Sequence, residues 1–200
     1  MATQAHPADA QAFIAHIRDG GYRPNRYRVT LVGIEGLKEI DASLAKAASE
    51  DFSFMCTSAQ LPSSTLGVAE AAYFGRPIKL AGDKTFNDWT CEVYYTKRVR
   101  DLFEKLHDNM LGFETNLASA GYSDPLNYYF DARVETLDRE GNVGIIYDMK
   151  QIFPMEIGEV ALSYENNNQI ARFPVTFAVN YFVRADNGGI NKRLANQPKS

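Results

Sequence analysis

Apolar and polar side chains alternate along most of this chain, which is the period of half-buried β-strands. The clearest run is 170–183, where one face carries Phe173, Val175, Phe177, Val179 and Tyr181. Its other face is small and mostly uncharged. Similar runs occupy 27–32, 52–58, 71–80, 85–96, 128–138, 141–153 and 158–165. These runs predict a mainly β protein with antiparallel strands.

The stretch LAGDKTFNDWT, residues 80–90, contains Gly-Asp-Lys-Thr and so resembles part of a phosphate-binding loop. A phosphate loop needs a second glycine at fixed spacing and a helix after the lysine. Here Asp83 would repel phosphate, and the residues that follow alternate like a strand. We therefore expect a turn, with a hairpin formed by the segments on either side of it.

Helical periodicity is strongest at 97–111, where Val99, Leu102, Phe103, Leu106 and Met110 form one stripe. This pattern predicts one long amphipathic helix from about Arg98 to Leu111. A shorter helical pattern lies near the N-terminus, within residues 1–20, and ends at Gly20-Gly21. Residues 35–50 are polar and alanine-rich, and we expect an inserted loop there, with room for one or two helical turns.

Composition and charge exclude several classes of function. The chain has 200 residues, a formal net charge of -4 and 45% hydrophobic residues, which suits one sizeable domain. A dedicated nucleic-acid binder would be strongly basic, and no apolar run is long enough to span a membrane. The three histidines and two cysteines have no metal-ligand spacing, and no catalytic constellation is visible. We expect no enzyme activity, cofactor or metal. Cys56 and Cys91 are most simply free thiols, and a disulfide between them is the alternative that the sequence leaves open.

Several ordered motifs resemble the tail tube proteins of T4-like contractile-tailed bacteriophages. They are RPNRYRV, FSFMCTSAQLP, FGRPIKLAGDKTFNDWTCEVYY, an amphipathic helix, and IFPMEIGEVALSYENNNQIARFPVTFAVNYF. Each motif alone indicates the family only weakly, but their occurrence in this order is specific. The resemblance covers residues 21–183 except 35–50, whereas a polar basic tail continues through 184–200.

The resemblance implies an antiparallel β-sandwich or partly rolled barrel with a flanking helix. It implies hexameric rings that stack into the inner tube of a contractile tail, the conduit for genome ejection. The implied partners are further copies of this chain, the tail sheath protein, the baseplate tube-initiator, the tail terminator and the tape measure protein. DNA would pass through the lumen without specific binding. The implied location is the virion tail, assembled in the host cytoplasm.

Two sets of residues are candidates for these roles. Assembly is expected to use a hairpin that contains Phe74, Arg76, Ile78, Asp83, Lys84 and Phe86. A channel for DNA should be neutral to acidic and lined by small groups, because each lysine or arginine contact with phosphate strengthens binding to the DNA and slows its passage. If Val160, Leu162 and Tyr164 join the core face of the last strand, the lumen-facing residues are Glu159, Ser163, Glu165, Arg172, Thr176 and Asn180.

Three alternatives stay open from sequence. A baseplate tube-initiator shares the expected fold, and so does the tube of a related contractile injection or secretion system. The basic tail either contacts an acidic neighbour, such as an adjacent ring or the sheath, or serves as a disordered solubilising segment.

Overall fold

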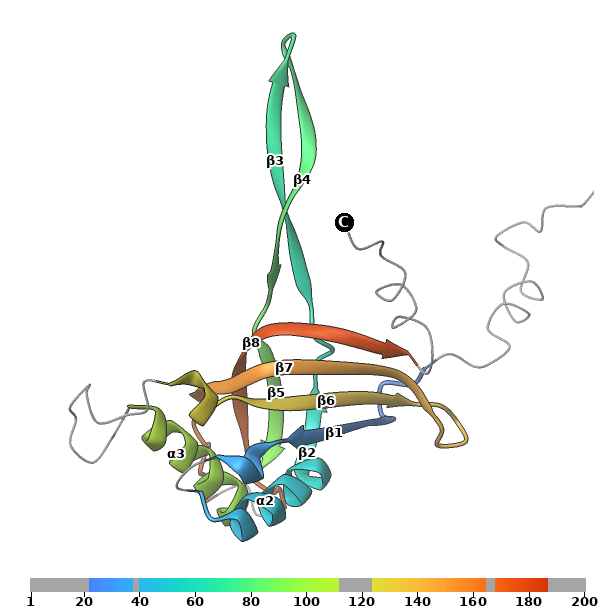
Figure 1. Ribbon diagram of the computed structural model, residues 1–200. Helices are drawn as coiled ribbons and strands as arrows, with labels where there is room; N and C mark the ends of the chain where they lie inside the picture. Colours follow the sequence, from blue (N-terminus) through green and yellow to red (C-terminus); the bar gives the residue numbers. More distant parts are fainter. Residues whose placement is uncertain (1–21, 38–39, 112–123, 165–167, 187–200) are drawn as a thin grey trace, which may run out of the picture.

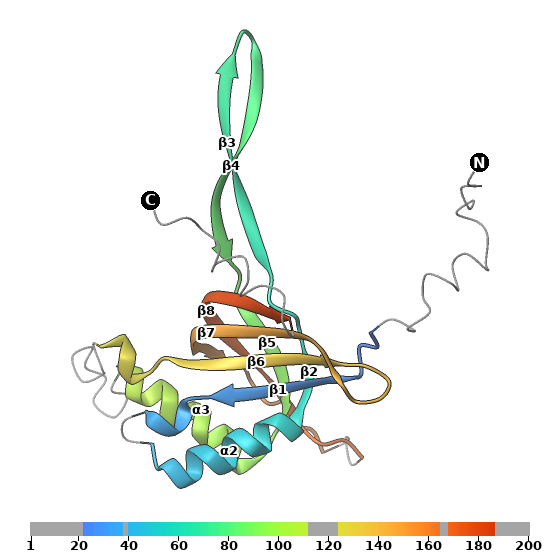
Figure 2. The same ribbon diagram turned by 45° about the vertical axis from the view of Figure 1, so that its right-hand side comes forward.

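The computed structural model describes residues 22–37, 40–111, 124–164 and 168–186. A curved six-stranded sheet with two helices on one side forms the body, and a long two-stranded hairpin stands away from it (Figures 1 and 2). Both sheets are antiparallel throughout. The expectation of a mainly β, antiparallel fold is confirmed.

Six strands form the main sheet. In spatial order they are β1 (Tyr27–Val32), β6 (Phe130–Leu137), β7 (Val143–Ile157), β8 (Arg172–Asp186), β5 (Trp89–Tyr94) and β2 (Cys56–Ala59). The first and last strands of this order approach each other, because the Tyr27 hydroxyl donates a hydrogen bond to the Cys56 carbonyl oxygen at 3.0 Å. Burial raises the pKa of Tyr27 to about 12, so this phenol stays protonated and able to donate. The sheet is therefore rolled into a nearly closed barrel.

An aromatic cluster fills the rolled sheet, with Phe177 of β8 at its centre. Trp89 stacks on Phe177 at 5.1 Å between ring centroids, while Phe103 and Phe130 meet it edge-on at 5.7 and 6.1 Å. All four side chains are buried. Edge-to-face and offset aromatic pairs add to the stabilisation that comes from burial alone. This cluster holds three strands and one helix together.

Two helices close the open side of the roll. Helix α3 (Lys97–Leu111) lies where the sequence predicted it, and Val99, Leu102, Phe103 and Leu106 are buried. Within the described part of the chain, no helix is both long and apolar enough to cross a membrane.

Helix α2 (Ala42–Met55) corrects two expectations: an inserted loop at 35–50 and a strand beginning at Phe52. Asp41 caps its first turn by accepting a hydrogen bond from the Ser43 backbone amide at 2.9 Å. Ala45, Ala48 and Phe52 are buried at helical spacing. Small alanine side chains give a weak hydrophobic signal, yet they allow the helix to lie close to the sheet. A short 3-10 turn, η1 (Ile34–Gly36), precedes α2.

A β-bulge in β7 determines which side chains of that strand reach the core. Met149 and Ile152 are both buried, although residues three apart in a regular strand face opposite sides. Gln151 has a positive φ of 54° and the pairing with β6 shifts register here. Asp131 stabilises the bulge, since its carboxylate accepts hydrogen bonds from the Gln151 amide at 3.1 Å and from Lys150 Nζ at 2.7 Å. The bulge thus turns both apolar residues inward.

The predicted strand at 158–165 is wrong, because β7 ends at Ile157 and residues 158–163 have no regular structure. The Gly158 amide donates to the Pro174 carbonyl oxygen at 2.8 Å, and a Cβ at Gly158 would lie 2.4 Å from Pro174 Cγ. The chain therefore leaves the sheet at this close approach. Val160 is half-buried against the core, but Leu162 and Tyr164 are exposed rather than core residues.

The remaining strand expectations are mostly confirmed. Phe173, Val175, Phe177 and Val179 are buried on one face of β8, whereas Tyr181 is exposed and its neighbour Phe182 packs against the core instead. The turn between β6 and β7 is confirmed, with Asp138 accepting backbone hydrogen bonds from Glu140 and Asn142. Strand β8 continues three residues beyond 183, to Asp186. The expected helix within 1–20 and the tail beyond 186 lie outside the described residues.

Replacing Phe103 by Ala should lower the free energy of unfolding by about 3–5 kcal/mol, because the ring is fully buried and its loss leaves a cavity. Chemical denaturation of the free subunit measures this change. Phe54→Ala is the matched control, since Phe54 lies on α2 with its side chain exposed and should shift unfolding by less than about 0.5 kcal/mol.

Candidate assembly interface

The hairpin of β3 (Ser64–Tyr73) and β4 (Arg76–Phe86) is the part of the described chain most exposed to solvent. All ten residues of β3 are exposed, and β4 is exposed except at Gly82 and Phe86. In both ribbon views the hairpin points away from the sheet and from the helices (Figures 1 and 2). An isolated two-stranded hairpin is marginally stable at best in water, so these strands require a further contact.

The hairpin turns at Phe74-Gly75, and the predicted turn in the stretch 80–90 is wrong. Phe74 and Gly75 have φ values of 45° and 78°, and Tyr73 pairs with Arg76 across them. Two consecutive positive φ values are the geometry of a two-residue type I′ turn, which matches the twist of antiparallel strands. Residues 80–86 belong to β4, and Asn87-Asp88 links β4 to β5.

One face of the outer hairpin is apolar. The cross-strand pairs Ala69–Leu80 and Ala71–Ile78 share this face with Tyr73, because alternate residues of a strand point the same way. The opposite face carries the pair Glu70–Lys79, whose charged groups are 4.0 Å apart. The large exposed apolar residues of the hairpin are Leu66, Val68, Tyr73, Phe74, Ile78 and Leu80. Val68 lies on the same side as Glu70, so exposed apolar side chains occur on both faces, and this many of them mark an interaction site.

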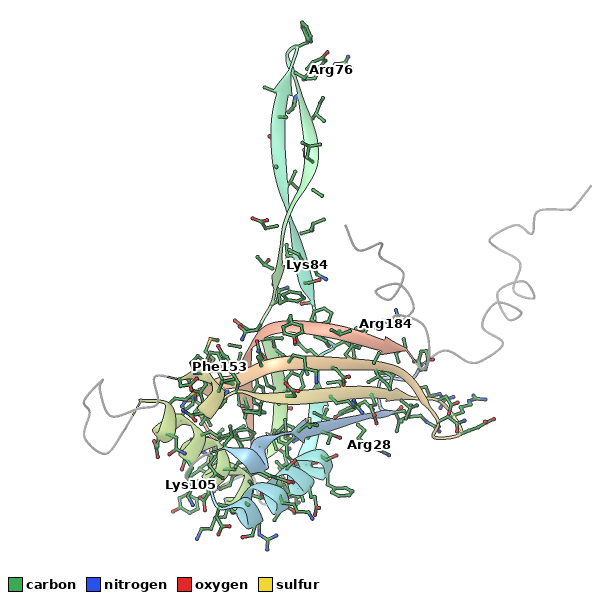
Figure 3. All side chains as sticks on the ribbon, in the orientation of Figure 1. Arg28, Arg76, Lys84, Lys105, Phe153 and Arg184 are labelled. Carbon is green, nitrogen blue, oxygen red and sulfur yellow. The ribbon has the colours of Figure 1, made fainter. Side chains whose placement is uncertain are left out.

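A close approach of two glycines lets the strands cross. A Cβ at Gly82 would lie 3.0 Å from the carbonyl carbon of Gly67, and a Cβ at Gly67 would lie 3.2 Å from the Asp83 carbonyl oxygen. The pairing also shifts register here, between Leu66 and Val68. Between the labelled residues Arg76 and Lys84 the two strands cross over each other (Figure 3). Glycine at both positions permits this contact between backbones.

The base of the hairpin is fixed to the main sheet. The Phe86 ring meets Phe182 of β8 edge-on at 5.3 Å, and Lys84 Nζ lies over both rings at 4.9 and 5.5 Å. The Asn87 side chain donates to Ser63 Oγ at 2.9 Å, and its backbone amide donates to the Ser63 carbonyl oxygen at 3.1 Å. These contacts set the direction in which the hairpin leaves the body.

The residues expected to assemble the protein all belong to this hairpin. Phe74 is at its tip, and Arg76, Ile78, Asp83, Lys84 and Phe86 lie along β4. Arg76 is next to the tip and Lys84 is towards the base (Figure 3), and Phe86 is the last residue of β4. Lys84 and Phe86 therefore orient the hairpin, whereas the assembly residues nearer the tip face solvent.

The residues expected to face a lumen are only partly brought together. Arg172, Thr176 and Asn180 share the face of β8 that is opposite the core, since Phe173, Phe177 and Val179 are buried on the other face. Glu159 and Ser163 are in the irregular segment after β7, so alternation does not place them, and Glu165 lies outside the described residues. Arg172 Nη1 is 3.7 Å from Glu92 of β5, a partner that the sequence did not indicate.

Sequence analysis missed a set of cross-strand ion pairs on this same outer face of the sheet. Arg133 makes two hydrogen bonds to Asp148, at 2.6 and 3.2 Å, and these raise the pKa of Arg133. The other pairs are Lys150–Asp131 at 2.7 Å and Arg28–Glu135 at 3.7 Å. Alternating charges at 131, 133 and 135 were the available signal, but the pairing needs the strand register. Each basic group in these pairs, like Arg172, has a carboxylate beside it.

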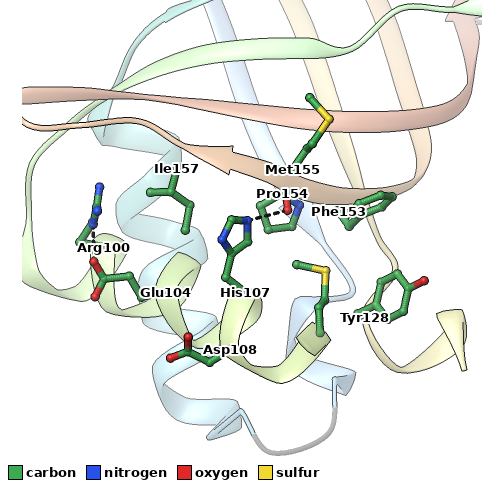
Figure 4. Close-up of a pocket in the computed structure, with 10 residues that line it drawn as sticks. Arg100, Glu104, His107, Asp108, Tyr128, Phe153, Pro154, Met155 and Ile157 are labelled. Carbon is green, nitrogen blue, oxygen red and sulfur yellow. Dashed lines mark hydrogen bonds and ion pairs between the residues drawn. The ribbon is translucent and has the colours of Figure 1, made fainter. Parts of the chain in front are cut away.

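A second feature that the sequence did not indicate is a cleft of about 630 Å³ between α3 and β7 (Figure 4). His107 Nε2 lies 2.9 Å from the Pro154 carbonyl oxygen and joins the two elements. In the described ranges no group of three or more histidine, cysteine or acidic side chains is arranged to hold a metal ion. The cysteines are both free, with Cys91 buried and Cys56 partly buried.

Comparison with known protein families identifies the family to which this chain belongs. A family model described as phage tail tube protein matches residues 22–185, which is more than half of the chain. The chain belongs to the phage tail tube protein family. The resemblance seen in the sequence motifs is therefore confirmed, and members of this family are structural proteins.

Individual relatives agree with this assignment. This tail tube chain is 29% identical over 136 residues to tail tube protein gp19 of Enterobacteria phage T4, in a match covering 66% of the chain and 82% of the relative. The corresponding protein of Enterobacteria phage T6 matches to the same extent.

Solved structures show the same fold at low identity. One chain of the extended sheath–tube complex of the PVC extracellular contractile injection system has a TM-score of 0.57 and 13% identity, covering 90% of this chain and 99% of its own. A chain in the baseplate of the anti-feeding prophage has a TM-score of 0.55 and 11% identity, covering 92% and 98%.

Replacing Gly82 by Ala should disturb the hairpin without unfolding the body. The added Cβ would press on the Gly67 backbone at 3.0 Å, which forces the strands apart where they cross. We expect faster amide hydrogen exchange throughout β3 and β4, with exchange in β6 to β8 unchanged. Ala81→Ser, at an exposed neighbouring position, is the control and should leave exchange in the hairpin as it is.

Proposed function

We propose that this tail tube protein assembles into hexameric rings that stack into the inner tube of a contractile phage tail. The observation that carries the proposal is the long hairpin, whose apolar side chains and strand edges have no cover within the described part of the subunit. The architecture of stacked rings is inferred from the tail tube family, to which the chain belongs. The tube would serve as the conduit for genome ejection.

The edges of the main sheet show why the hairpin is the element that needs a partner. Ser49 of α2 donates to the Leu31 carbonyl oxygen of β1 at 3.0 Å, so the helix occupies part of that edge. Strand β8 pairs with β7 on one side and with β5 on the other through Arg172–Phe177. Its C-terminal half, from Ala178, pairs only with β7 among the described strands. That open half is suited to pairing within a ring, and the hairpin is suited to contact between rings.

The outer face of the sheet is our candidate for the wall of the lumen. It carries Thr176 and Asn180 together with the four ion pairs, in which every basic group lies within 3.7 Å of a carboxylate. Such exposed pairs contribute little to stability, so their effect on the potential of this surface matters more. A phosphate would have to displace a carboxylate to reach each arginine or lysine. DNA could then slide past without specific binding.

The proposed partners follow from this role. They are the sheath around the tube, the baseplate tube-initiator, the tail terminator and the tape measure protein within the lumen. The solved structures of the same fold come from a sheath–tube complex and a baseplate, which supports contacts with these classes of partner. A baseplate initiator and the tube of an injection system are the alternative roles, and both would use the same hairpin. The virion is the proposed location, after assembly in the host cytoplasm.

Replacing Ile78 by Pro tests the role of the hairpin. Proline removes a backbone donor from β4 and an apolar side chain from its exposed face, but Ile78 makes no contact with the core. Polymerisation should fall at least tenfold, measured by sedimentation of tubes formed with the baseplate as nucleus. The unfolding midpoint of the free subunit should change little.

Ile78→Val is the matched control, since it keeps the backbone donor and most of the apolar surface, and it should polymerise nearly as well as the parent. Equal polymerisation of the proline variant and the parent would contradict a role for the hairpin in assembly.

The lumen assignment is tested by chemical access to Asn180, which is exposed in the subunit. In a Cys56→Ser background, Asn180→Cys should react with a bulky maleimide in free subunits and be protected in intact tubes. Lys105→Cys, on the exposed side of α3, is the comparison position outside the proposed lumen. Rapid labelling of Asn180→Cys in intact tubes would show that this face is not the lumen wall.

A further inference from the structure

The hairpin tip carries an aromatic pair in a backbone conformation that does not favour it. Type I′ turns prefer asparagine, aspartate or glycine at the first central position, yet Phe74 occupies it with φ of 45°. A bulky residue with positive φ is strained. Phe74 is 91% exposed and meets the Tyr73 ring edge-on at 4.7 Å. The subunit therefore accepts strain and solvent exposure to present two aromatic rings at the far end of the hairpin.

The cleft between α3 and β7 has the shape and chemistry to receive such a tip. Its walls are mostly apolar, and its rim carries the carboxylates Glu104 and Asp108 (Figure 4). The apolar lining residues are Met110, Tyr128, Phe153, Pro154, Met155 and Ile157. A volume of about 630 Å³ falls within the range of sites that hold compact apolar groups.

We propose that the Tyr73-Phe74 tip of one copy docks into the α3–β7 cleft of a second copy. This proposal rests on the proposed function and names the receiving surface for the hairpin. The cleft offers Met110 and Met155, whose thioethers make favourable contacts with aromatic ring edges. The body of the same subunit gives the tip no comparable cover, because the tip is exposed where it stands.

Charge supports the same pairing. Arg76 is the first residue after the turn, so its guanidinium accompanies the tip into any contact. Arg100 at the cleft already bonds Glu104 and donates to the Gly158 carbonyl oxygen at 2.9 Å. Asp108, one helical turn after Glu104 on α3, is the carboxylate placed to receive Arg76 (Figure 4). One arginine and one acid across an otherwise apolar contact would fix its orientation.

The placement of the two surfaces determines the kind of assembly. The hairpin leaves one side of the sheet, and α3 covers the other side (Figures 1 and 2). Ten residues of β3 extend about 33 Å at the usual rise of a strand, so the tip reaches well beyond its own body. A contact between different patches at opposite sides of a subunit is head-to-tail, and its repetition builds an open-ended stack.

A photo-crosslink from the tip tests this docking. Tubes are assembled from a Phe74→p-benzoylphenylalanine variant mixed with isotope-labelled parent protein, irradiated and analysed by mass spectrometry. We expect crosslinks between chains, from position 74 to peptides containing 97–111 or 153–157. Crosslinks in well-formed tubes to any other region would overturn the cleft as receptor and leave the proposed assembly standing. Failure of the parent protein to form rings or tubes would instead contradict the proposed function.

Variants of the cleft give an independent readout. Met155→Glu places a charge among the apolar walls and should raise the concentration needed for polymerisation at least tenfold. Leu126→Glu, an equally drastic change at an exposed apolar residue outside the cleft, is the control and should have little effect. Asp108→Arg should weaken stacking, and combination with Arg76→Asp should restore it. Unchanged polymerisation of Met155→Glu, or occupation of the cleft by residues 112–123 of the same chain, would overturn the proposal.

Discussion

A two-stranded hairpin has no interior, and that constraint governs how this protein works. Beyond its base, where Phe86 meets Phe182, the hairpin turns every side chain toward either solvent or another molecule, because the two strands are too thin to bury anything between them. The sequence nevertheless places leucine, valine, isoleucine, tyrosine and phenylalanine there. Apolar groups in that position gain their stabilisation only when a second molecule covers them. The free subunit therefore leaves these apolar groups uncovered, and we propose that another copy of the chain covers them.

The rolled sheet supplies the rigidity that the hairpin lacks. Phe177 connects Trp89, Phe103 and Phe130 in one buried cluster, and Trp89 Nε1 also donates to the Gln60 carbonyl oxygen at 2.6 Å, close to the start of the hairpin. Phe182, which packs against the core, contacts Phe86 at the hairpin base. The direction of the hairpin is thus tied to the core. A structural protein that must add identical units in register benefits from such a fixed direction.

Strong periodicity made the main strands and helix α3 predictable from sequence. Alternation identified the core face of β8 and β5, because large side chains repeat at every second position. Helix α2 was missed because Ala45 and Ala48 carry little hydrophobic signal, although their small size is what allows close packing. The position of the hairpin turn was also predicted wrongly, because Phe74-Gly75 is an unusual turn sequence, while Gly82-Asp83 looks like an ordinary one.

The candidate surfaces were predictable only in part. The residues named for assembly do fall on one hairpin, since they are close in sequence. The ion pairs of the outer face depend on strand register, and the α3–β7 cleft depends on how a helix lies against a bulged strand. Neither can be read from local pattern. Apolar residues after Gly158 follow a strand-like alternation, yet this segment forms no strand.

Electron cryomicroscopy of tubes assembled from the purified protein is the most direct test of the central claim. The account predicts stacked hexameric rings in which the hairpin of each subunit is covered along its apolar face by a subunit of the neighbouring ring. Tubes in which the hairpins stand free in solvent, or fold back onto their own subunits, would contradict it.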